Sequence, residues 1–141
     1  MQIENTPFEI VDWTSIPATE YPGETGAAFW RTKHAGDIRV RMVEYTPGYL
    51  ADHWCGKGHI LLVLEGTLVT ELDDGRVFTM TPGMSYQVAD GAAPHRSRTE
   101  TGVKLFIVDW RNLLGRVRFS VGGRPPGLPP SLARRNFADH R

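Results

Sequence analysis

The 141-residue sequence contains a single cysteine, Cys55, so no disulfide can form within the chain. The value of this thiol must then lie in packing, metal ligation or reactivity. No apolar run approaches the ~18 residues that a membrane-spanning helix needs. The opening residues, MQIENTPFE, lack the basic and hydrophobic regions of a signal peptide. We therefore expect a cytoplasmic protein with no membrane partner.

Motifs that mark several well-known protein classes are also missing. The sequence has no phosphate-binding glycine-rich loop, no nucleophile elbow and no zinc-finger spacing. Its hydrophobic content of 40% and charged content of 23% are ordinary for a globular protein, which excludes a disordered chain. At this length we expect a single domain that is large enough to bury a core.

Acidic residues are scarce in one part of the chain. Residues 111–141 hold seven arginines against one acid, Asp139, and so carry a net charge of +6. Because the whole chain has a net charge of zero, residues 1–110 carry −6. A basic tail can indicate a nucleic-acid partner. Lysines and interleaved aromatic residues are scarce there, however, so we expect no nucleic-acid partner. We expect this tail to lie across the acidic body of its own chain or of a second subunit.

What the sequence does contain is many short runs separated by turn residues. Glycine occurs 15 times and proline 10 times, and this punctuation predicts an all-β sandwich or barrel. We predict a loop at Ile16–Gly26. We predict strands at Phe8–Trp13, Ala27–Thr32, Ile38–Tyr45, Ile60–Leu64, Thr67–Leu72, Arg76–Met80, Ser85–Val88 and Val103–Trp110. Further on, Val117–Val121 is a weaker predicted strand and Ser131–Asp139 a predicted helical turn or two.

Three of these strands carry further expectations. Ile60–Leu64 and Val103–Val108 are apolar at nearly every position, whereas a strand of a lone barrel needs only one apolar face. Burial of both faces indicates a homodimer, or covering segments from the same subunit. In Ile38–Tyr45, Arg39 and Arg41 share the face opposite the apolar side chains, where they can meet an anionic ligand, solvent or a subunit contact.

Metal-ligand residue types gather in the stretch from Gly48 to Gly66. His53 and Cys55 alternate, so in an extended strand their side chains share a face, and after a short glycine-containing turn His59 opens the next strand. Imidazole and thiolate are good ligands for a late first-row transition metal. The alternative is one surface histidine, one core histidine and an inert buried thiol. Three donors at this spacing beside an apolar strand favour a metal site.

These residues resemble the two sequence motifs of the cupin superfamily. Six residues separate His59 from Gly66, so His59 stands where cupins usually have a glutamate, and Cys55 and His53 fall on the two motif histidines. His95, in Ala92-Ala93-Pro94-His95, resembles the last cupin ligand. The likeness covers residues 38–110, and Asp52-His53-Trp54-Cys55 also resembles a subgroup of single-domain cupins named for a DHCW-type motif.

The resemblance implies an all-β, cupin-type double-stranded β-helix (jelly-roll) barrel in a single domain. Residues 38–110 would form the barrel core, residues 1–37 strands and loops packing on it, and residues 111–141 an Arg/Pro/Gly-rich C-terminal extension. The implied metal ligands are His53, His59 and His95, with Cys55 as a further ligand or as a wall residue. They would hold one divalent transition metal per chain, with iron, zinc, nickel and manganese not distinguishable.

Cupins range widely in activity, so the implied function stays broad. The open coordination site would take a small polar molecule as its ligand, in a metal-dependent dioxygenase or isomerase. The alternatives are a non-catalytic module that senses a ligand or metal, and a cupin that has lost its metal.

Of Tyr86 and Gln87, which lie on opposite faces of one strand, only one can reach the interior, and the sequence does not decide which. Arg96 and Arg98 share the face opposite His95, so we expect them outside the cavity.

Overall fold

The structure is a computed structural model that describes residues 3–110, all of which lie in one compact unit. The strand predicted at Val117–Val121, the helical turns predicted at Ser131–Asp139 and the contacts predicted for the basic tail lie outside the described residues. Within the described range, no helix is long and apolar enough to cross a membrane.

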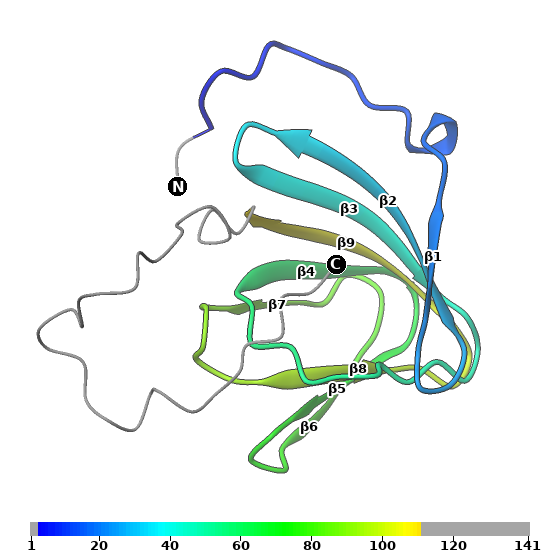
Figure 1. Ribbon diagram of the computed structural model, residues 1–141. Coiled ribbons are helices and arrows are strands. Elements are labelled where there is room, and N and C mark those ends of the chain that lie inside the picture. The colour runs from blue at the N-terminus through cyan, green and yellow to red at the C-terminus, as the bar shows by residue number, and fades with distance from the viewer. Residues whose placement is uncertain (1–2, 111–141) are drawn as a thin grey trace, which may run out of the picture. The chain divides into compact units, whose positions relative to one another are not determined.

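The described chain is built from antiparallel strands, with one 3-10 turn at Trp13–Ser15. Two sheets form, one with the strand order β1-β2-β3-β9-β4-β7 and one with the order β6-β5-β8 (Figure 1). The strands are β1 (Thr19–Pro22), β2 (Ala27–Ala35), β3 (Ile38–Tyr45), β4 (His59–Gly66), β5 (Leu68–Leu72), β6 (Val77–Met80), β7 (Ser85–Val88), β8 (His95–Arg98) and β9 (Val103–Trp110).

The two sheets share one hydrophobic core. From the six-stranded sheet Val43, Leu61 and Leu105 are buried, and they cluster with Leu68 and Met80 from the three-stranded sheet. Non-consecutive strands are neighbours, because β9 pairs with both β3 and β4. This arrangement confirms the predicted all-β jelly-roll barrel. Apolar side chains that point inward from both sheets hold it together.

Two of the predicted elements are wrong at the start of the chain. Phe8–Trp13 forms no strand, and Phe8 is almost fully exposed because no neighbouring strand pairs with this segment. The first strand is instead β1, inside the segment predicted as a loop. Pro22 is tolerated there because β1 is an edge strand that pairs only with β2. The predicted bounds of β3, β7 and β9 agree with the structure.

The outer face of the six-stranded sheet is unusually apolar. In β4 and β9 burial alternates strictly along most of the strand, so Leu61, Leu105 and Ile107 point into the core. The intervening residues point outward, and apart from Lys104 they are apolar as well. Among these, Ile60 is 46% exposed and Trp110 is 44% exposed. The described chain therefore leaves apolar side chains in solvent on this face.

Candidate functional site

Three side chains with metal-binding atoms converge inside the barrel. One ligand atom each from Cys55, His59 and His95 lies within 4.8 Å of the others. His95 is buried, while Cys55 and His59 are half-buried. Thiolate and imidazole at this separation can hold a late first-row metal ion, so the group is a possible metal site.

The backbone fixes the positions of these donors. Cys55 and His95 form an isolated antiparallel bridge, with N–O distances of 2.7 Å from Cys55 N to His95 O and 3.0 Å in the other direction. His59 is the first residue of β4, and the preceding Gly58 lies so close to the β7–β8 loop that a Cβ atom would come within 2.6 Å of Asp90 N. A glycine is therefore required where the chain turns into β4.

His95 is held in the protonation state that a metal ligand needs. Its Nδ1 lies 2.8 Å from the carbonyl oxygen of Ala93, which can only accept, so Nδ1 carries the hydrogen. Burial lowers the pKa of His95 below its usual value, although the bond to Ala93 opposes this shift. The neutral ring then presents the lone pair of Nε2, which lies 3.2 Å from His59 Nε2. Such an outer hydrogen bond orients a ligating imidazole.

The Cys55 thiol sits in an environment that favours its anionic form. Burial raises the pKa of Cys55, but hydrogen bonds with His59 and the backbone of Lys57, together with the charges of His59 and Arg41, lower it further than burial raises it. The net effect is a pKa below the usual value of a cysteine. A thiolate is the form that binds metals.

Tyr86 completes the group and settles the choice between Tyr86 and Gln87. Its hydroxyl lies 2.8 Å from His59 Nε2, whereas Gln87 is exposed. The register of β4 and β7 pairs Tyr86 with the inward-facing Leu61, so register would have identified it. Burial raises the pKa of Tyr86 far above its usual value, so the phenol keeps its proton and can donate a hydrogen bond into the site.

His53, the fourth predicted ligand, lies outside this group. Its Nδ1 contacts a carboxylate oxygen of Asp52, and its side chain is 41% exposed. Alternation between His53 and Cys55 assumes a regular strand, but Asp52 and His53 form a bend and only Cys55 makes a β-bridge. The two side chains therefore need not share a face.

The arginines of β3 point inward, and solvent is not their main environment. Arg39 donates from Nε and Nη2 to the two carboxylate oxygens of Asp109, both at 2.7 Å, and Arg41 donates from Nη2 to Asp109 Oδ2 at 3.0 Å. Asp109 and Arg41 are buried. Burial raises the pKa of Asp109, but Arg39, Arg41 and Lys57 lower it further, so its usual pKa is reduced. The sequence pattern does not reveal this cluster, because Asp109 lies next to the end of a strand that is mostly apolar.

Arg96 and Arg98 lie outside the cavity, as alternation along β8 predicts. Both pair with Glu71 on β5, at 2.8 Å for Arg96 Nη2 and 2.7 Å for Arg98 Nε. Arg96 also lies over the ring of Trp54, with its Cζ atom 4.9 Å from the ring centroid. These contacts are structural, and they place no charge in the donor group.

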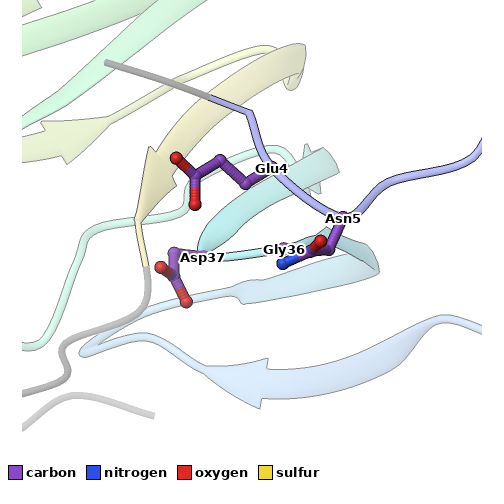
Figure 2. A pocket seen from close by; sticks show the side chains of 4 residues that line it. All are labelled: Glu4, Asn5, Gly36 and Asp37. Carbon is purple, nitrogen blue, oxygen red and sulfur yellow. The ribbon is translucent and has the colours of Figure 1, made fainter.

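One pocket, of about 400 Å³, touches the candidate site at its edge. It is lined by His59 and Asp109 together with outward-facing residues of β4 and β9 such as Ile60 and Trp110, so it opens on the outer side of the sheet. The other, of about 310 Å³, lies where the N-terminal segment meets the β2–β3 turn (Figure 2). Its lining residues, Glu4, Asn5 and Gly36-Asp37, include none of the metal donors. The first pocket therefore meets the candidate site only through His59 and Asp109, and the second does not meet it.

Comparisons with known proteins identify the fold. No family model and no curated protein matches the sequence. Among solved structures, the polyketide cyclase RemF from Streptomyces resistomycificus is 21% identical, with a TM-score of 0.60 over 72% of this chain and 78% of that one. Ectoine synthase from P. lautus is 17% identical, with a TM-score of 0.59 over 72% and 76% of the two chains.

A predicted oxalate decarboxylase from Thermotoga maritima gives the same result. It is 15% identical, with a TM-score of 0.60 over 71% of this chain and 96% of that one. These three structures are cupins, and at such identities they report on fold alone. The DHCW-type subgroup stays a prediction. The resemblance read from residues 38–110 is confirmed at the level of architecture: the protein has the cupin fold.

Proposed function

We propose that this protein is a metal-dependent enzyme that binds a small polar molecule at an open coordination position. The observation that carries the proposal is the convergence of one sulfur and two nitrogen donors, from Cys55, His59 and His95, within 4.8 Å of one another. Three protein ligands leave room for water or substrate, as catalytic sites require. The bound ion would supply Lewis-acid polarisation of an oxygen atom of the substrate.

The donor set favours chemistry in which the metal keeps its oxidation state. A thiolate with two imidazoles suits zinc well, whereas non-haem iron oxygenases use two histidines and a carboxylate. Tyr86 supports the same conclusion, because a protonated phenol 2.8 Å from His59 can donate a hydrogen bond to a carbonyl or enolate oxygen. We therefore place isomerisation or a related enolisation ahead of oxygen activation.

Metal analysis of site variants tests the ligand set. Full-length protein purified without chelator or affinity tag should carry close to one equivalent of a divalent transition metal. His95→Ala and Cys55→Ser should each lower the content at least tenfold, because outer contacts alone change metal affinity by 10–100-fold and these are direct ligands. His53→Ala is the matched control and should keep its metal. Full metal content in Cys55→Ser, or loss in His53→Ala, would contradict this ligand set and restore the three-histidine alternative.

Two further measurements separate the reaction classes. Oxygen consumption by the Fe(II)-loaded protein across small thiols, diketones and phenols should stay at the level of the His95→Ala variant. Exchange of the α-hydrogen of a small oxo acid or diketone in deuterated water, followed by NMR, should depend on both the metal and Tyr86. Metal-dependent oxygen uptake would favour the dioxygenase. Binding of a ligand without exchange or turnover would favour a sensing module.

We further propose that the protein forms a homodimer through the outer face of its six-stranded sheet. Support comes from the exposed apolar side chains of Ile60, Leu64 and Trp110 on β4 and β9. An apolar patch of this kind commonly marks a protein interface. The alternative is that a segment of the same chain covers this apolar face.

Light scattering after size-exclusion chromatography distinguishes these occupants. The full chain should elute as a dimer, and Leu64→Arg should give a folded monomer. Val77→Arg, a change of another exposed apolar side chain on the three-stranded sheet, should leave the dimer intact. A monomeric wild-type chain would contradict the dimer and favour coverage by the chain itself.

A further inference from the structure

A row of polar side chains crosses the interior of the barrel beside the metal donors. Arg39 and Arg41 of β3 share a face with the buried Val43, and the register pairs Arg39 directly with Asp109 of β9. Trp30 of β2 pairs with Val43 and lies on the same side. The guanidinium group of Arg41 lies over the Trp30 ring in a cation–π contact, with its Cζ atom 4.3 Å from the ring centroid. The row therefore extends across three neighbouring strands.

Positive charge is in excess in this row. Asp109 is the shared carboxylate partner of Arg39 and Arg41, so the three side chains carry a net charge of +1. Lys57 adds a further positive charge close enough to interact with all three, and Asp90, which also interacts with Lys57, balances that charge, so the excess stays at +1. Unbalanced charge in a barrel interior is costly unless an opposite charge compensates for it. An anionic ligand would provide that compensation.

Two buried donors in the row lack an acceptor within the described part of the chain. They are Arg41 Nε and Trp30 Nε1. Buried N–H groups are nearly always paired, and each exception calls for an explanation. Both atoms are donors only, so the missing partner must be an acceptor. The excess positive charge and the two missing acceptors point independently to the same kind of ligand.

The row also reaches the metal site. Arg41 is near enough to Cys55 to influence its charge, and Asp109, the partner of Arg41, lines one pocket together with His59. A small molecule that enters from this side can meet the arginine row at one end and the open coordination position at the other.

We infer that the barrel interior beside this row takes a small carboxylic acid, whose carboxylate accepts hydrogen bonds from Arg41 and Trp30 while the rest of the molecule faces the metal donors. This inference deepens the proposed function by naming the substrate class, and its second half rests on that function. The planar guanidinium fork matches a carboxylate. The competing explanation is structural: the arginines only hold Asp109, and water satisfies the two donors.

Titration of the indole N–H signals provides a direct test. In a proton–nitrogen NMR spectrum of the full chain, the Trp30 signal is the one missing from Trp30→Phe. Malonate, succinate and pyruvate would be added in turn, with malonamide, succinamide and inorganic phosphate as comparisons. The Trp30 signal should move downfield with at least one carboxylate and not with the amides, and the indole signals of Trp54 and Trp110 should stay in place.

Variants separate a binding role from a structural one. Arg41→Gln should weaken carboxylate binding at least tenfold, and Arg98→Gln, which removes one positive charge on the other sheet, should leave it unchanged. If Arg41→Gln fails to fold, Trp30→Phe serves instead, because it removes one donor and keeps the ring; it should weaken binding about threefold to tenfold, the ordinary value of one hydrogen bond.

The titration is run on metal-loaded and metal-stripped protein, so that the two proposals can fail separately. Carboxylate binding to the stripped protein supports the anion site even if the protein never holds a metal. One equivalent of bound metal without any carboxylate response keeps the proposed function and overturns this inference. Equal responses to acids and amides, or a response to phosphate alone, would also overturn it.

Discussion

Replacing Asp109 by asparagine should destabilise the protein more than any exposed charge change. The substitution preserves shape, so it opens no cavity, but it removes the negative charge between two arginines. Three hydrogen bonds of 2.7–3.0 Å are affected, and the Asp109 side chain is fully buried. Removing one partner of a buried ion pair costs about 3–5 kcal/mol. We expect a loss in that range, at the upper end because two arginines lose their shared partner.

The assay is urea unfolding followed by circular dichroism, with a thermal scan beside it, in a buffer free of carboxylates and phosphate. A chain of 141 residues lies between the size classes of smaller and larger domains, where the melting temperature falls by roughly 4 °C per kcal/mol, so the variant should melt about 12 °C lower or more. Asp74→Asn is the control, because the Asp74–Arg76 pair is exposed and should leave the melting temperature unchanged. A loss below about 1 kcal/mol in Asp109→Asn would refute the claim that Asp109 neutralises buried charge.

Three further outcomes follow from the same contacts. Because the folded-state pKa of Asp109 is depressed, its contribution to stability is complete above about pH 4 and is lost as pH falls through the folded pKa, so acid unfolding should begin at higher pH in Asp109→Asn. Gly66→Ala should destabilise far more than Gly75→Ala in urea unfolding: both glycines have positive φ, but only at Gly66 would a Cβ meet a backbone atom, Gly102 O at 2.1 Å. Tyr86→Phe should keep its full metal content by elemental analysis while affinity for pyruvate, whose carbonyl oxygen would accept from the phenol, falls about fivefold to tenfold, and metal loss would mean that the phenol itself is a ligand.

The fold could be predicted from the sequence where local pattern and long-range pairing agree. β3 alternates clearly and ends at turn residues, and its predicted bounds, Ile38–Tyr45, are those observed. Phe8–Trp13 has strand-like composition but no partner, and β-structure depends on pairing more than on propensity. The reverse holds for β1, where the pairing of Thr19 with Trp30 outweighs an unfavourable proline at Pro22.

The candidate site could be predicted in part, for the same reason. His59 and His95 begin regular strands, Cys55 is tied to His95 by a backbone bridge, and the ligand atoms of the three lie close together. Their role as metal ligands stays a prediction. His53 lies in a bend, where side chains do not alternate between two faces as they do along a strand. The arginine row escaped prediction because Ile38, Val40 and Met42 form the more obvious core face. Only the pairing of β3 with β9 reveals that this apolar face points outward.

Three strands, β3, β4 and β9, contribute core residues at one end and residues of the candidate site at the other. Along β9 the inward side chains are apolar from Val103 to Ile107 and then become Asp109, and β3 changes in the same way from Val43 to Arg41. β4 is the third case, with Leu61 followed at its start by His59. Rigid strands anchored in a packed core hold functional groups more precisely than loops do. The charged end costs stability, and the apolar end offsets that cost. Substitutions at the apolar end should therefore affect stability alone, whereas those at the charged end, such as Asp109→Asn, should affect both stability and binding.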